Sequence, residues 1–176
     1  MPGKKVLLEE DNDIEAVVID VTESPIERPK KKQGSYYSGK KKKHTIKTQL
    51  IVNRSTKEII CTAHAEGKPH DFKLFEISIG SGISKGILAQ ADSGYQGILK
   101  LHSNSETPKK KPKGGELSAE EKDENKRLSR DRILVENINA KIKVFKTVAN
   151  KYRNRRRRFG LRMALLCGII NFEARI

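Results

Sequence analysis

Two apolar segments of this chain end in an aspartate, a residue whose oxygens can bind hard metal ions. Asp20 follows the run 16–19 and Asp92 follows the run 87–91. Such runs are typical of strands covered on both faces in an α/β sheet, and these sheets bind ligands beyond the carboxyl ends of their strands. A lone aspartate there is more often a turn former or a helix cap. Asp20 therefore needs partner residues before it indicates a site.

A third carboxylate, Glu136, falls in the segment 119–150, which lacks glycine and proline. Ser118 and Glu121 have capping-box spacing, so we expect a helix from there to about residue 150, with a break near Ser129. Its apolar face is traced by Leu134, Ile138, Ile142, Phe145 and Ala149. Arg132, Glu136 and Lys143 align on a neighbouring face, because four and seven residues make about one and two turns. The ordinary interpretation of that alignment is a surface ladder of charge pairs.

If the three carboxylates converge, they define a recognisable chemistry. Without cations they would repel and raise one another's pKa. Magnesium relieves the repulsion, since it prefers oxygen ligands and keeps positions for water and substrate phosphate. Two ions about 4 Å apart can activate an attacking oxygen and stabilise the leaving oxygen of a phosphodiester. The expected reaction is phosphoryl transfer.

The remaining patterns predict the elements that would position these acids. Alternation at Ile46, Leu50 and Val52, and again over 58–63, indicates a hairpin, so the first three strands should form an antiparallel meander. Asp71 can cap a short helix that ends at 80–82, and residues 98–101 are a candidate fifth strand. A last amphipathic helix, 162–172, should cover the sheet.

Charge points to a polyanionic partner. Among 176 residues, 37 Lys and Arg face 22 Asp and Glu, a formal charge of +15. Nucleic acid or an acidic membrane surface are the usual partners. We expect two exposed basic loops, 28–43 and 103–117. For the first, a solvated loop and a phosphate-binding one are equally compatible with the composition. The apolar run 163–170 is too short to cross a bilayer, so we expect an intracellular, cytoplasmic protein.

Other segments carry weaker signals. Residues 1–13 lack periodicity, and we expect a loosely ordered lead before a single domain over 14–176. Cys61 and Cys167 lack metal-site or redox spacing and should be small buried hydrophobes. Tyr36, Tyr37 and Tyr95 could stack on a base, although packing roles are the commoner use of such residues.

Taken together, these stretches resemble the catalytic domain of a DDE transposase from a bacterial insertion sequence, in the group related to PIF/Harbinger transposases. The matching stretches are Asp20-x-Thr22-Glu23, residues 28–44, His70-Asp71-Phe72, residues 91–97 and Arg132-x3-Glu136-x6-Lys143. The last is similar to the signature Tyr-x2-Arg-x3-Glu-x6-Lys, with Ser129 at the tyrosine position. The resemblance implies a ribonuclease-H-like α/β fold, a mixed five-stranded sheet with flanking helices.

The resemblance also implies roles for individual residues. Asp20, Asp92 and Glu136 would hold two Mg²⁺ ions, which Mn²⁺ can replace. The protein would cut transposon-end DNA and transfer the 3′ hydroxyl to target DNA, acting as a homodimer near the nucleoid. The residues expected to contact DNA are Lys40, Lys41, Lys42, Lys43, Arg132, Lys143, Arg155, Arg156, Arg157 and Arg158. Contacts of this kind hold the backbone and carry no base information.

Three alternatives stay open at this point. Family members usually carry a helical DNA-binding region before the first aspartate, and only a short lead precedes Asp20 here. An upstream reading frame could supply that region, or the chain could be an inactive DNA-binding remnant or regulator. A ribonuclease-H-like nuclease without strand transfer is the second alternative, and a small basic structural protein is the third.

Overall fold

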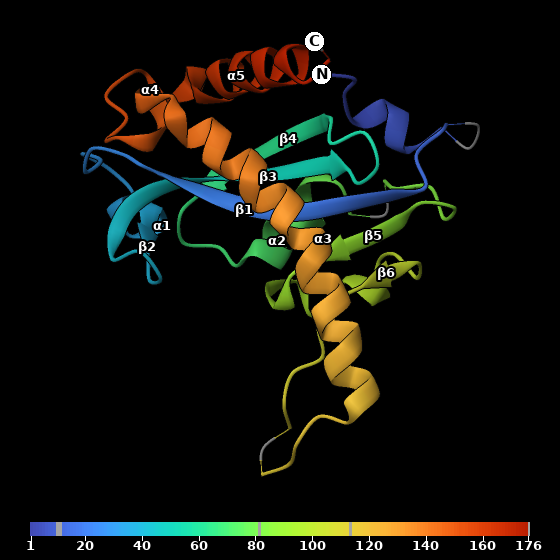
Figure 1. The fold of residues 1–176 in the computed structure, drawn as a ribbon. Helices are drawn as coiled ribbons and strands as arrows, with labels where there is room; N and C mark the ends of the chain where they lie inside the picture. Colours follow the sequence, from blue (N-terminus) through green and yellow to red (C-terminus); the bar gives the residue numbers. More distant parts are fainter. Residues whose placement is uncertain (10–11, 81, 113, 176) are drawn as a thin grey trace.

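A mixed sheet forms the middle of the molecule, with helices packed on both faces (Figure 1). The computed structural model describes residues 1–9, 12–80, 82–112 and 114–175. Its strands are β1 (Ala16–Pro25), β2 (Tyr37–Ser38), β3 (Lys43–Asn53), β4 (Ile59–Glu66), β5 (Leu88–Ala91) and β6 (Ser105–Glu106). The order is β4, β3, β1, β5, β6, and the short β2 pairs with the start of β3.

The pairing directions confirm the predicted meander. β1 is antiparallel to β3, and β3 is antiparallel to β4. β5 then joins the other edge of β1 in parallel, and β6 continues parallel to β5. The described residues thus give six strands where five were expected, because the two-residue β2 adds to the sheet. The sheet is mixed, as predicted.

Each face of the sheet has its own apolar core, because successive side chains of a strand point to opposite sides. Val18 contributes to one core, with Ile138 from α3 (Ala119–Val144) and Met163 from α5 (Phe159–Glu173). Val17 and Ile19 contribute to the other, under α2 (Asp71–Ser78). The remaining helices are the short α1 (Gln33–Tyr36) and α4 (Lys146–Ala149). The predicted cover of the sheet by the last helix is confirmed.

The first part of α3 extends beyond the sheet as an arm, and the helix then crosses over β1 (Figure 1). The predicted capping box is present: Glu121 N–H donates to Ser118 Oγ at 3.1 Å, and Ser118 N–H donates to Glu121 Oε2 at 3.0 Å. The expected break near Ser129 is wrong, because the Ser129 hydroxyl donates to the Asn125 carbonyl at 2.8 Å and leaves the helix intact. The helix instead ends at Val144, before α4.

Four local predictions need correction. The candidate strand at 98–101 is a 3₁₀ turn, Ile98–Lys100, entered through Gly97 at φ 103°. The fifth strand is β6, which lies inside the predicted loop 103–117. Asp71 is the first residue of α2, and its N-cap is His70. The loop 28–43 likewise contains α1 and β2.

The lead and the cysteines lie against the core. Residues Lys4–Leu7 form a 3₁₀ turn, and Leu7 is fully buried among residues of the α2 side, although the sequence predicted a loosely ordered lead. Cys61 and Cys167 are free and buried, as predicted. No helix in the described part of the chain has the length and apolar character needed to cross a bilayer.

Candidate active site

Asp20 and Asp92 occupy adjacent positions on neighbouring strands. The parallel ladder between β1 and β5 pairs Val18 with Gln90 and Ile19 with Ala91, and it ends there. The next residue of each segment is an aspartate, Asp20 on β1 and Asp92 directly after β5. β1 itself continues to Pro25, so the prediction that this strand ends at Asp20 is wrong. What ends at Asp20 is the contact with β5, because β5 stops at Ala91 and Asp92 caps the turn Ser93–Tyr95.

Asp20 carries a strongly perturbed carboxyl group. Its pKa is raised to about 6, mainly because burial penalises the charged form. The Val21 backbone N–H and the Arg132 guanidinium lower this pKa, whereas the negative charges of Asp92 and Asp71 raise it. Among the described residues, no cation lies within 4 Å of the Asp20 carboxylate. A positive charge bound here would stabilise the ionised form.

The α3 residue that contacts Asp20 is Asn139, and sequence reasoning missed it. Asn139 Nδ2 donates to Asp20 Oδ2 at 2.8 Å. The other amide atom, Asn139 Oδ1, is buried and has no hydrogen-bond partner in the described structure. Buried amide oxygens are normally paired, so this one is available to a water molecule or a cation beside Asp20.

Glu136 does not join the two aspartates. Its side chain is 59% exposed, and its Oε1 lies 3.6 Å from the Arg132 guanidinium. Three residues of helix turn through about 300°, so Glu136 lies about 60° from Asn139 around α3. The rotation carries Glu136 away from the buried stripe that includes Val135 and Ile138. This charge pair is the surface interaction that the sequence left open for the Arg132, Glu136 and Lys143 face.

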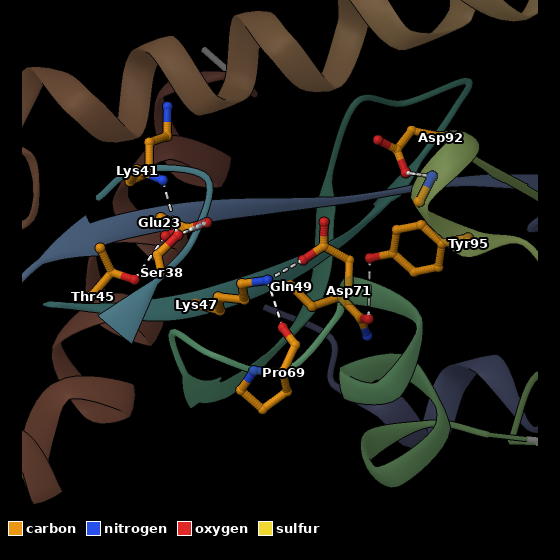
Figure 2. Close-up of polar contacts among 11 residues, drawn as sticks. Glu23, Ser38, Lys41, Thr45, Lys47, Gln49, Pro69, Asp71, Asp92 and Tyr95 are labelled. Atoms are coloured by element: carbon orange, nitrogen blue, oxygen red, sulfur yellow. Dashed lines mark hydrogen bonds and ion pairs between the residues drawn. The ribbon is translucent and has the colours of Figure 1, made fainter. Parts of the chain in front are cut away.

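A third acid, Asp71, lies near the pair on the other side of the sheet. Its carboxylate accepts from Lys47 Nζ at 2.7 Å, and Lys47 also donates to the Pro69 carbonyl at 2.6 Å (Figure 2). Lys47 and Asp71 expose 10% and 25% of their side chains. The charge of Asp71 also raises the pKa of Tyr95, after the larger effect of burial. The sequence signal that could have found this pair is a lysine, Lys47, within the strand β3, where the structure buries it.

Tyr95 connects the same region to β3. Its ring is fully buried, and its hydroxyl donates to Gln49 Oε1 at 3.3 Å. Figure 2 shows Tyr95 between the Asp92 turn and Gln49, with Asp71 nearby. The fully buried ring makes packing the role of Tyr95, which leaves its base-stacking interpretation without support.

The basic turn Lys40–Lys43 is anchored to β1 through Glu23. Glu23 accepts from the Ser38 and Thr45 hydroxyls at 3.1 and 2.7 Å, and Ser38 Oγ in turn accepts from the Lys41 backbone N–H (Figure 2). The four lysines are exposed. Glu23 is therefore a structural anchor of this turn and belongs to β1.

Two further predicted DNA contacts come from α3. Lys143 Nζ donates to the Glu23 carbonyl at 2.6 Å, and its pKa is lowered by burial and then by the nearby Lys41. Arg132 pairs with Glu136, and its Nε is buried without a partner in the described structure. Both side chains thus stand on the flank of α3 that holds Asn139.

The last predicted group, Arg155 to Arg158, lies elsewhere, between α4 and α5. All four residues are exposed. The structure therefore divides the predicted site residues into an acidic centre, a lysine turn beside it and a separate arginine cluster. In the parts of the chain that are described, no three His, Cys, Asp or Glu side chains are close enough to hold a metal ion together.

Comparison with known proteins gives two matches over this region. The model of the DDE superfamily endonuclease family matches residues 19–171. The chain is also 53% identical, over 173 residues, to a protein of Microchaete diplosiphon described as "Probable transposase for insertion sequence element IS702". The match covers 98% of this chain and 62% of that relative, so the chain spans about three fifths of the relative's length. No solved structure matches.

Proposed function

The chain belongs to the DDE superfamily endonuclease family, and we propose that it is the catalytic part of a transposase. It would cut DNA at the ends of an insertion sequence and join the freed 3′ hydroxyl to target DNA. The observation that carries this proposal is the adjacent placement of Asp20 and Asp92, with the pKa of Asp20 raised by burial and by the nearby charges of Asp92 and Asp71. The relative's description as a probable transposase supports it.

We infer that the fold is ribonuclease-H-like. The support is the order β4, β3, β1, β5, β6, with an antiparallel meander followed by two parallel strands. This order gathers the two aspartates at the point where β5 stops and β1 continues. A helix across the sheet can then supply a third group from one side. The arrangement of α3 over β1 meets that requirement.

The residues around Asp20 fit a divalent cation such as Mg²⁺ or Mn²⁺. Asp20 and Asp92 offer carboxylates, and the unpaired Asn139 Oδ1 offers a neutral oxygen beside them. Magnesium sites commonly use one or two carboxylates and leave the other positions to water and substrate phosphate. Bound cations would polarise the attacking oxygen and neutralise charge on the leaving one.

Glu136 remains the proposed third carboxylate, and its position along α3 supports that role. Asp131 of α3 accepts from Gln90 of β5, and Asn139 of α3 donates to Asp20 of β1. Glu136 lies between these two contacts along the helix. Its long side chain would have to leave Arg132 and turn toward the aspartates. A rotation of this kind breaks one partly exposed pair, in which Arg132 is 30% and Glu136 59% exposed.

The chain's own residues would hold the DNA and position the acids. Asn139 keeps Asp20 in one orientation through its Nδ2 donation. Lys40 to Lys43, with Lys143 behind them, would neutralise phosphates of a strand that runs over the second half of β1. Arg132 would neutralise charge near Glu136. Catalysis of phosphoryl transfer depends mainly on such positioning and charge neutralisation.

The proposed activity sets further requirements. Paired cutting of two element ends calls for a homodimer on DNA. Specific recognition of those ends calls for a DNA-binding region, which an upstream reading frame or the remaining two fifths of a protein like the relative could supply. Chromosomal DNA as the substrate would place the protein at the nucleoid.

A second candidate function is a DNA-binding regulator that cannot cut. The exposed position of Glu136, with an amide in contact with Asp20, favours it. Incubation with supercoiled DNA carrying the element's ends and Mg²⁺ or Mn²⁺ separates the two. The transposase gives nicked and joined products, and a nuclease without strand transfer gives cut ends alone. Binding without any cutting, in protein supplied with its DNA-binding region, would favour the regulator.

A further inference from the structure

A hollow of ≈ 740 Å³ lies beside the start of α5, and no residue of the acidic centre lines it. Its apolar wall is formed by Tyr36 of α1, Ile46 of β3 and Phe159 of α5. Its rim carries three consecutive arginines, Arg155, Arg156 and Arg157. We call this the arginine hollow. Its volume lies within the usual range for sites that take a small organic ligand.

The charge of the rim is uncompensated. Within the described residues, none of the three rim arginines has a carboxylate within 4 Å, whereas the nearby Arg153 lies 3.7 Å from Glu27. Guanidinium groups bind phosphate oxygens through paired hydrogen bonds and lose less hydration than an ammonium does. Three such groups on one rim call for an anion, and a phosphate is the best geometric match.

The interior offers surfaces on which a planar ring can stack. The Arg156 guanidinium lies 4.8 Å from the centroid of the Tyr36 ring. Aromatic rings and arginine planes are the usual stacking partners of unpaired bases. His64, which also lines the hollow, has a pKa lowered to about 4 by burial, so it brings no positive charge near neutral pH. Glu66 lines the hollow too and disfavours phosphate there.

We propose that the arginine hollow binds one unpaired nucleotide of a DNA strand. The phosphate would contact Arg155 and Arg157, and the base would stack on the outer face of the Arg156 guanidinium, whose inner face lies over the Tyr36 ring. Glu66 would then accept a hydrogen bond from an N–H group of the base, such as N3–H of thymine. The choice of DNA as the polymer rests on the proposed function, whereas the combination of a phosphate rim and a stacking surface comes from the hollow itself.

Two oligonucleotides of equal charge test the proposal. A labelled ten-residue oligothymidylate and an abasic strand of the same length are titrated with the full chain in EDTA, with fluorescence anisotropy as the readout. One stacked base should make the thymidylate bind about five- to a hundredfold more tightly, since each such contact contributes a factor of this size. Equal affinity for the two strands would overturn the proposal.

Matched variants locate the effect in the hollow. Tyr36→Leu keeps an apolar side chain but should abolish most of the preference for thymidylate. Tyr37→Leu is the control, because Tyr37 is exposed and its ring contacts His44 outside the hollow. Arg156→Ala should weaken both strands, and Arg153→Ala should change little. A preference that survives in a folded Tyr36→Leu protein, judged by circular dichroism, would show that the base binds elsewhere.

The result can be separated from the fate of the proposed function. The titrations contain no divalent cation, so they do not depend on cleavage. A thymidylate preference in a protein that never cuts DNA would support nucleotide binding in the hollow and contradict the transposase function. Cutting and joining by a protein without that preference would do the reverse.

Discussion

The acidic centre and the arginine hollow both carry charge without a counter-ion, but of opposite sign. At the acidic centre Asp20 is buried, and the neighbouring charges of Asp92 and Asp71 raise its pKa further. At the hollow the three rim arginines are exposed and lack a carboxylate partner among the described residues. A buried negative charge needs a cation at short range, whereas an exposed positive rim needs only a polyanion nearby.

The contrast teaches which property each region controls. Coulomb interactions are much stronger in a buried site than at the surface, where salt screens them. The acidic centre should therefore respond to divalent cations and to pH, and the hollow should respond to ionic strength. Asp71 shows the intermediate case, because Lys47 already neutralises it and no external cation is required.

The strongest test removes the negative charge of Asp20. Asp20→Asn should lower DNA cleavage by at least about a thousandfold, because the group acts directly on the ions and reacting oxygens. It should also weaken Mn²⁺ binding measured by calorimetry. Oligothymidylate binding in EDTA should stay unchanged, which keeps the two regions separate. Asp123→Asn is the control, since Asp123 is an exposed acid on α3. Cleavage within tenfold of wild type would contradict this role.

Two α3 variants sharpen the boundary of the acidic centre. Glu136→Gln should reduce cleavage by about a hundredfold or more if the side chain completes the site, since such groups contribute several kcal/mol. Asn139→Ala should cost about tenfold, because Asn139 acts through the orientation of Asp20. The measurement is cleavage at saturating Mn²⁺, with exposed Asn137→Ala as the control. A larger loss of cleavage in Asn139→Ala than in Glu136→Gln would show that Asn139, and not Glu136, is the more important α3 residue of the acidic centre.

A third test uses pH in the absence of divalent cations. The pKa of Asp20 is about 6 in the folded protein against 3.8 as the reference value, so the folded state retains a proton that the unfolded state has lost. Stability contributed by this group is therefore present below about pH 4 and lost as pH rises through 6. At pH 7.5, Asp20→Asn should be more stable than wild type by on the order of 2–3 kcal/mol.

Urea unfolding of both proteins at pH 4.5, 6 and 7.5 measures that difference. His64 has its pKa lowered to about 4, so it favours unfolding as pH falls below 6.5, but this effect is common to both proteins and cancels. Added Mg²⁺ should stabilise wild type more than the variant at pH 7.5. A difference between the proteins that does not vary with pH would contradict the raised pKa.

The smallest expected effect concerns the hollow. The double variant Arg155→Ala/Arg157→Ala should lower oligonucleotide affinity several-fold and reduce the slope of log K against log salt by roughly 1.4, about 0.7 for each phosphate contact. Cleavage at saturating DNA should be unchanged. Anisotropy titrations from 50 to 300 mM salt provide the slope. A fall in cleavage with an unchanged salt slope would show that the arginines act on cleavage and not on binding of the DNA backbone, against the separation of the two regions.

Much of the fold could be predicted because its signals are local. The run before Asp20, the alternation of β3 and the capping box at Ser118 each depend on residues adjacent in sequence, and all three predictions are confirmed. The errors came where a long-range pairing decided the element. β6 exists only because Ser105 and Glu106 pair with Ala89 and Gln90, and nothing within residues 103–117 announces a strand.

The sequence by itself determined which groups this protein can use: an acid after each of two buried strands, a helical glutamate, lysine and arginine clusters, and a charge suited to DNA. Tertiary structure decided which of these groups lie next to one another. The register of β1 on β5 set Asp20 beside Asp92, and the rotation of α3 about its core stripe turned Asn139 toward Asp20 and left Glu136 exposed. Residue type fixes chemical capacity, but the approach of two side chains depends on how distant elements pack, which no local pattern records.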